Sequence, residues 1–112
     1  MYYVSKRFEI SGAHAVDYPT EGSCERLHGH NWIITVHCKS KELDGNGMVY
    51  DFTKIKKILH GALDHTNLNE TLPYNPTSEN IARWCAEQIG ETCWKVEVAE
   101  TESNLAVWER DE

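Results

Sequence analysis

The feature that most constrains this chain is an alternation of apolar and polar residues in two segments of its first half. Residues 2–10 place apolar side chains at nearly every second position, with Lys6 as the exception. Residues 30–39 repeat this period, and Trp32 and Ile34 begin their apolar face. A period of two predicts strands that bury one face. Between them, residues 11–29 are expected to form a long loop, and loops of that length are usually functional or disordered.

Two helices are predicted in the middle of the chain, because the apolar period there lengthens to between three and four residues. Asp51 is the expected N-cap of the first helix, and Thr77 or Ser78 that of the second, which Gly90 ends. The apolar stripe of the first helix consists of Phe52, Ile55, Ile58, Leu59, Ala62 and Leu63. That of the second consists of Ile81, Trp84, Cys85 and Ile89.

Two further strands are predicted at the end of the chain, over 94–100 and 105–108, with Trp94, Val96 and Val98 on one face. The order is β-β-α-α-β-β, which predicts a single α+β domain over 1–112, with an antiparallel sheet and two helices on one of its faces. A sheet this small leaves its outer strands uncovered. Pairing with another subunit would cover them, so we expect an oligomer.

Composition narrows the class of protein. The chain has 112 residues, of which 40% are hydrophobic and 26% charged, as in ordinary globular domains. A net charge of −7 and the lack of a basic run argue against nucleic acid as a direct ligand. We expect no membrane span and no signal peptide. The four cysteines include no CxxC pair, and without a signal peptide we expect a reducing, cytoplasmic location in which they stay thiols and do not form disulfides.

Three of the six histidines concentrate in the long loop and the strand that follows it. His28 and His30 are two residues apart, so in an extended chain both side chains point the same way. His14 would lie near them if the first two strands pair as a hairpin. Three imidazoles leave one position of a tetrahedral site open, as in catalytic zinc sites. The alternative is three loop histidines that only form hydrogen bonds.

Other candidate residues flank these histidines or end the regular elements. Cys24 lies four residues before His28 and would be a base or nucleophile beside a metal, its fourth ligand, or an inert thiol. Asp64 and His65 follow the first helix and can act as an oriented pair if the backbone there is not helical. Otherwise His65 is a helix-end histidine. Glu100 continues an apolar strand face, where a carboxylate needs a partner unless it is already in solvent.

Six short motifs occur in order along nearly the whole chain. They are ISGAH (10–14), CERLHGH (24–30), DF (51–52), LDHTNLN (63–69), NPTSEN (75–80) and ET (100–101). Together they resemble the 6-pyruvoyltetrahydropterin synthase and 6-carboxytetrahydropterin synthase (QueD) family. The resemblance implies a tunnelling fold, in which the sheets of several subunits join into a barrel with the helices outside. It also implies a homohexamer made of two trimers.

The resemblance also implies roles for individual residues. His14, His28 and His30 match the zinc ligands, and Cys24 matches the catalytic thiol. Asp64 and His65 match a catalytic dyad that reaches the site from a neighbouring subunit. Glu100 matches the carboxylate that binds the pterin ring, and Thr77 and Ser78 match residues lining its pocket. The implied substrate is 7,8-dihydroneopterin triphosphate, with zinc polarising the carbonyl that forms.

The segment around Cys24 bears on the reaction. Cys-x-x-x-HGH is similar to the type that makes 6-carboxytetrahydropterin for deazapurine synthesis. Glu25 also gives Glu-x-x-HGH, which resembles members that cleave the same substrate to 6-hydroxymethyldihydropterin for folate. Glu25 is therefore a further candidate for contact with substrate. 6-Pyruvoyltetrahydropterin synthesis is another alternative. A noncatalytic zinc or pterin-binding module, with Cys24 as fourth ligand, is an alternative of a different class.

Overall fold

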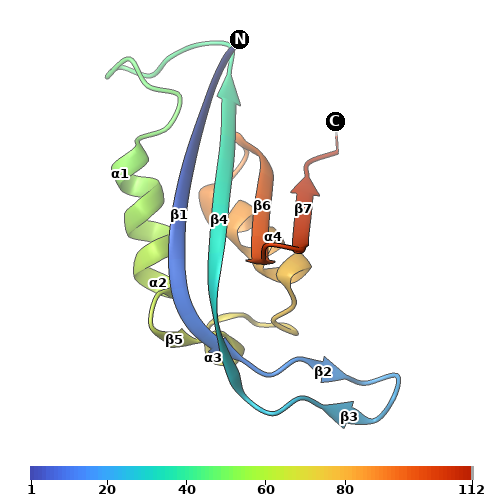
Figure 1. Cartoon of the computed structure of the whole chain (residues 1–112). Coiled ribbons are helices and arrows are strands. Elements are labelled where there is room, and N and C mark those ends of the chain that lie inside the picture. Colours follow the sequence, from blue (N-terminus) through green and yellow to red (C-terminus); the bar gives the residue numbers. More distant parts are fainter. Residues whose placement is uncertain (112) are drawn as a thin grey trace.

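A computed structural model describes residues 1–111 as one five-stranded sheet with helices on one side and a small hairpin projecting from its end (Figure 1). The sheet has the order β5-β1-β4-β6-β7. Its strands are β1 (Tyr2–His14), β4 (His28–Ser40), β5 (Thr66–Asn67), β6 (Cys93–Thr101) and β7 (Asn104–Glu109). The hairpin consists of β2 (Asp17–Tyr18) and β3 (Ser23–Cys24). The helices are α1 (Phe52–Ile55), η1 (Lys56–His60), α2 (Gly61–Leu63), α3 (Leu68–Thr71) and α4 (Ser78–Ile89).

The α+β prediction and the order of the main elements are confirmed, with two small additions. The long strands β1, β4, β6 and β7 pair antiparallel, as expected. Strand β5 was not predicted and pairs parallel with Gly12 and Ala13 of β1. The short helix α3 was not predicted either. Both lie within 64–71, where the segments are too short for an apolar period to show.

The long loop predicted over 11–29 is shorter than expected, because 11–14 belong to β1 and 28–29 belong to β4. β1 and β4 stay paired to their ends, where Gly12 faces His30 and His14 faces His28. Gly12 is needed for close packing, because a Cβ there would lie 3.3 Å from both the Trp32 ring and the Thr66 carbonyl oxygen. What remains of the loop is a hairpin arm, residues 15–27, which carries β2 and β3 away from the sheet (Figure 1).

The first predicted helix is one continuous stretch with a π-helical turn, η1, in its middle. Asp51 caps it, because its carboxylate accepts from the N–H of Thr53. The buried residues follow a spacing of four, at Ile55, Leu59 and Leu63, because a π turn holds more residues than an α turn. Phe52 was predicted to join this stripe and does not, since it is 46% exposed.

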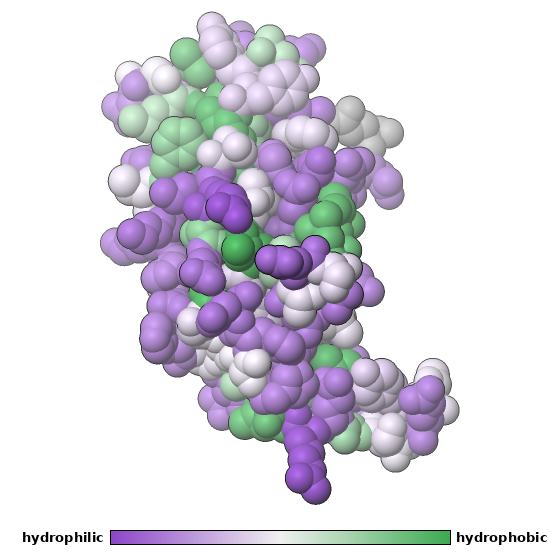
Figure 2. All heavy atoms as spheres, viewed as in Figure 1, coloured by the Kyte–Doolittle hydropathy of each residue, from purple (hydrophilic) through white to green (hydrophobic). Residues whose placement is uncertain are grey.

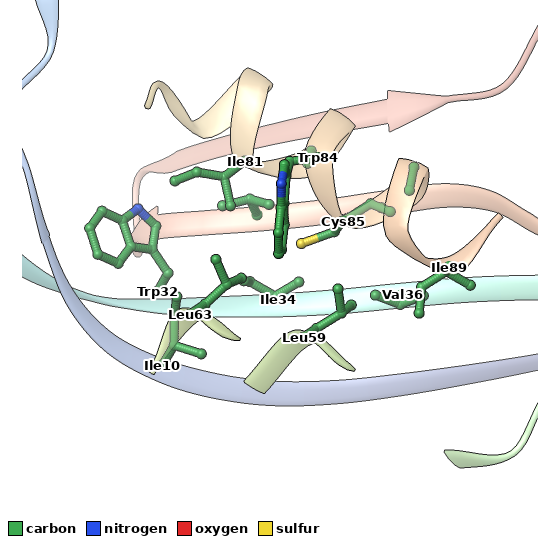
Figure 3. Close-up of a cluster of buried hydrophobic side chains, with 14 of the residues drawn as sticks. Ile10, Trp32, Ile34, Val36, Leu59, Leu63, Ile81, Trp84, Cys85 and Ile89 are labelled. Atoms are coloured by element: carbon green, nitrogen blue, oxygen red, sulfur yellow. The ribbon is translucent and has the colours of Figure 1, made fainter. Parts of the chain in front are cut away.

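The core lies between one face of the sheet and two helical segments, the continuous stretch from α1 to α2 and the helix α4 (Figure 3). Thr77 caps α4 and Gly90, at φ 100°, ends it, both as predicted. The apolar stripes of the helices meet the inward residues of β1 and β4, as Leu63, Ile10 and Trp32 show in Figure 3. Burying one such side chain stabilises the fold by ~1.5–3 kcal/mol. This layer therefore fixes the helices against β1 and β4.

Trp94 was predicted to face the core, and it lies on the other face of the sheet. The β4–β6 register shifts between His37 and Cys38, so that Cys93 faces Cys38 and takes the buried place. The Trp94 ring instead packs against the rings of Tyr3 and His37, with centroids 6.2 and 6.0 Å apart. A β-bulge of this kind leaves no mark in an alternating sequence.

The face of the sheet opposite the helices is shown in Figure 2, with hydrophilic side chains over much of it and apolar patches between them. Leu105 and Val107 of the edge strand β7 are exposed. Within residues 1–111, no helix is long and apolar enough to span a membrane.

Candidate active site

Four side chains converge at the end of the sheet from which the hairpin arm leaves. They are His14 of β1, His28 and His30 of β4, and Glu100 of β6, and one ligand atom of each lies within 4.8 Å of those of the others. The antiparallel register places His14 directly opposite His28, and the period of two places His30 on the same side. The predicted hairpin therefore does bring the three histidines together.

Two of these imidazoles are fixed in one tautomer by backbone carbonyls. Nδ1 of His14 lies 2.7 Å from the Pro76 carbonyl oxygen, and Nδ1 of His28 lies 2.7 Å from that of Arg26. A carbonyl oxygen only accepts, so each Nδ1 carries the hydrogen and each Nε2 offers a lone pair. A backbone carbonyl that accepts from the other ring nitrogen is typical of histidines that bind metals.

The donor atoms fit a divalent cation. Nε2 of His14 is buried and has no hydrogen-bond partner among the described residues. His14 itself is 2% exposed. An unpartnered lone pair in such a place is costly unless something binds it. Three imidazole nitrogens and a carboxylate are the ligand types that zinc accepts.

Glu100 belongs to this cluster and is not a solvated residue at a strand end. Its Oε1 lies 2.8 Å from Nε2 of His30 and 3.8 Å from Nε2 of His14. Its Oε2 accepts a hydrogen bond from the Ser78 hydroxyl at 3.2 Å. Glu100 also borders a cavity of 390 Å³ together with Ser78 and Asn104. The carboxylate of Glu100 therefore contacts the histidines and also borders an open cavity.

Thr77, the other predicted pocket residue, has its hydroxyl engaged elsewhere. Its oxygen accepts from the N–H of Asn80 at 3.1 Å, which caps helix α4. Its side chain thus holds the helix start that positions Ser78.

Cys24 and Glu25 lie next to each other on the hairpin arm and differ in their contacts. Cys24 is exposed. Within residues 1–111, the side chains close enough to bind one metal ion together with His14 do not include Cys24. The structure therefore gives no support to Cys24 as a fourth ligand. Glu25 points back to the cluster, with Oε1 3.9 Å from Nε2 of His28. The same oxygen accepts from the N–H of Val16 at 3.0 Å.

Asp64 and His65 form an oriented pair, on a backbone that has left the helix. His65 has φ 56°, and its Nδ1 lies 2.8 Å from Oδ2 of Asp64. The Ser11 N–H donates to Oδ1 of Asp64 at 2.8 Å, and this bond is the main reason that the pKa of Asp64 is lowered. The His65 side chain is 81% exposed. The His65 imidazole therefore faces outward, whereas Asp64, 21% exposed, is held against β1.

Comparisons with known proteins decide the family. The sequence profile of 6-pyruvoyl tetrahydropterin synthase matches residues 3–111. The chain belongs to this family. The 6-carboxy-5,6,7,8-tetrahydropterin synthase of Synechocystis is 35% identical, over 95% of this chain and 92% of that protein. The dihydroneopterin monophosphate aldolase of Pyrococcus furiosus is 41% identical, over 74% of this chain and 70% of that protein.

Solved structures give the same family. The 6-pyruvoyl tetrahydropterin synthase of Caenorhabditis elegans superposes with a TM-score of 0.74 at 26% identity, over 98% of this chain and 96% of that one. The fold is thus that of the tetrahydropterin synthases, as the motifs indicated.

Several residues that shape this candidate site carried no predicted role. Asn69 and Asn75 bind the hairpin arm, the Pro76 carbonyl orients His14, and Nε2 of His60 lies 3.5 Å from Oδ2 of Asp64. Both asparagines stand within the motifs LDHTNLN and NPTSEN. Their place in these motifs could have marked the two asparagines as functional. An asparagine in a loop, however, does not reveal which backbone groups its side chain will bind.

Proposed function

We propose that this protein is a zinc-dependent 6-carboxy-5,6,7,8-tetrahydropterin synthase. It would convert 7,8-dihydroneopterin triphosphate and one water to 6-carboxytetrahydropterin, acetaldehyde and triphosphate, in queuosine and deazapurine biosynthesis in the cytoplasm. The observation that carries the proposal is the unpartnered Nε2 of His14 facing two more imidazoles. Relatives named as 6-carboxytetrahydropterin synthases support the choice of reaction.

The residues divide the work by their chemistry. His14, His28 and His30 would hold the zinc, which would supply a Lewis acid for the substrate side chain. Glu100 would accept from N–H groups of the pterin ring in the cavity beside Ser78, and Thr77 would keep that wall in place.

Proton transfer would fall to groups at the edges of the site. Cys24, which lies on the hairpin arm, would act as general base and general acid on the side chain of the substrate. His65, held by Asp64, would act on another subunit's substrate. Its exposure of 81% in the single chain supports a role across an interface.

The assembly that this requires is a homohexamer, a dimer of trimers. The apolar edge strand β7 supports further strand pairing between subunits. Light scattering at micromolar protein should give a hexamer, and a monomer would contradict the proposal. Mixing inactive Cys24→Ala and His65→Ala subunits should restore part of the activity, because some sites would receive both intact groups.

Product analysis with 7,8-dihydroneopterin triphosphate tests the reaction. The expected product is 6-carboxytetrahydropterin, whereas 6-pyruvoyltetrahydropterin would indicate the other synthase activity. No turnover by the zinc-loaded protein would favour a noncatalytic binding module. Cobalt substitution tests that module, because a Cys24 ligand would give a thiolate-to-cobalt charge-transfer band and three histidines would not.

A second reaction, cleavage to 6-hydroxymethyldihydropterin, is favoured by the position of Glu25 beside His28 and by the similarity to the aldolase. A thiol and a carboxylate differ by ~4 units in reference pKa and suit different proton transfers. Glu25→Gln should lower the yield of this product and leave 6-carboxytetrahydropterin largely unchanged, because glutamine still accepts from the Val16 N–H. If both yields stay the same, the second reaction does not depend on Glu25.

A further inference from the structure

The base of the hairpin arm is a short extended segment that is held on both sides by side chains. Val16 exchanges hydrogen bonds with Glu25, because its carbonyl accepts from the Glu25 N–H at 2.9 Å and its N–H donates to the Glu25 carboxylate at 3.0 Å. The backbone groups of an extended chain alternate between its two sides. Those of Ala15 and Asp17 therefore point away from Glu25.

Two asparagine amides bind those groups in the same way. Asn69 accepts from the Ala15 N–H at 2.8 Å and donates to the Ala15 carbonyl at 2.9 Å. Asn75 accepts from the Asp17 N–H at 2.9 Å and donates to the Asp17 carbonyl at 2.8 Å. Each amide thus replaces the residue that a neighbouring strand would supply. We call these two contacts the amide clasps.

The amide clasps connect the arm to the parts that build the site. Asn69 belongs to α3, and Asn75 stands next to Pro76, whose carbonyl orients His14. The backbone carbonyl of Asn75 also accepts from the Asn80 side chain at 2.9 Å, which ties it to the start of α4. The arm has no other anchor of this kind, since most of its residues are exposed in the described part of the chain.

We propose that Asn69 and Asn75 are positioning residues. They would fix Cys24 and Glu25, near the base of the hairpin arm, relative to the three histidines. Neither would touch the substrate. They would act by completing the 15–17 strand, whose other side carries Glu25. The consequence for catalysis rests on the proposed function of Cys24 and Glu25, but the consequence for the order of the arm does not.

Hydrogen exchange of the protein alone tests the order of the arm. In Asn75→Ala and Asn69→Ala, the amides of Val16 and Glu25 should lose protection by about 10-fold or more, although their own partners are intact. The matched control is Asn46→Ala, an exposed turn residue for which protection should stay at the wild-type value. Unchanged protection at Val16 and Glu25 in both clasp variants would overturn the proposal.

Kinetics then tests the consequence for catalysis. Asn75→Ala should lower kcat by up to ~10²-fold, the order of cost of a misplaced catalytic group, with zinc content and KM close to wild type. In a Cys24→Ala background the same substitution should lower kcat by no more than about twofold, because it acts through the arm. An equal loss in both backgrounds would contradict positioning. A wild type without turnover would refute the proposed function and leave the exchange result to decide on the clasps.

Discussion

The helix-covered sheet and the hairpin arm are built in different ways. The sheet and its helices are held together by apolar burial, and Ile10 and Ile34 of the sheet and Leu59 of the helix above it are fully buried. The arm buries little and is held by hydrogen bonds from Asn69, Asn75 and Glu25. Apolar layers are stable to small changes, whereas an exposed hydrogen-bonded segment opens at low cost. The rigid part therefore carries the three histidines and Glu100, and the exposed arm carries Cys24 and Glu25.

The largest effect is expected where the two regions meet, at His28, the first residue of β4. Wild-type protein should contain about one zinc per chain. His28→Ala should lose most of this metal and all activity, because two imidazoles and a carboxylate remain. Elemental analysis measures it, and metal content equal to wild type would show that His28 is not a ligand.

Cys24→Ala changes the arm alone and should separate chemistry from structure. We expect kcat for carboxytetrahydropterin formation to fall by ~10²–10⁴-fold, the usual contribution of a general acid or base. Zinc content and Tm should stay at the wild-type values, since Cys24 is exposed. Loss of zinc together with activity would point to a structural zinc site with a thiolate ligand.

Leu59→Ala changes the sheet-facing layer alone and should give the opposite result. Leu59 is fully buried on the helix that covers β1 and β4. The free energy of unfolding should fall by ~2–5 kcal/mol, as for other large-to-small core substitutions. Turnover per folded, zinc-loaded chain should be unchanged below the melting range. A fall in this turnover to the level of Cys24→Ala would mean that the two regions are not separable.

The smallest effect concerns Asp64, whose pKa is lowered below the ordinary 3.8, chiefly by the Ser11 N–H. A group with a lowered pKa contributes stability above its unfolded value, and this is lost as pH falls through the folded value. Asp64→Asn should therefore show less acid destabilisation than wild type below about pH 4. Chemical denaturation at a series of pH values measures the difference. Parallel pH profiles would mean that Asp64 titrates normally.

The sequence predicted the fold and the meeting of the three histidines because both follow from simple periods. Strand alternation places His28 and His30 on one side, and hairpin pairing brings His14 opposite His28. It could not predict the bulge that turns Trp94 outward, since the residues on either side of a bulge keep their alternation. Glycines led to the expectation of a loop where Gly12 serves close packing inside a strand.

The anchoring contacts of the site were also beyond the sequence. The clasp of Asn75 on Asp17 joins positions 58 apart in the chain, and the hydrogen bond of Pro76 to His14 joins positions 62 apart. Such contacts depend on how the loops are packed and not on any local pattern. The roles of Cys24, Glu25 and His65 stay predictions that the variants above test, and the roles of Glu100 and Asp64 stay predictions.

Residues 75–78 bind four different parts of the protein in succession. Asn75 holds the arm, the Pro76 carbonyl orients His14, Thr77 caps α4, and Ser78 binds Glu100. Because each of these four residues makes a different contact, the contacts fix the length of this segment. An insertion or deletion here would disconnect the arm, the metal ligand, the helix and the carboxylate at once. The exposed turn at 43–47 does not connect these parts of the protein. Insertions and deletions for engineering or grafting should therefore be made there.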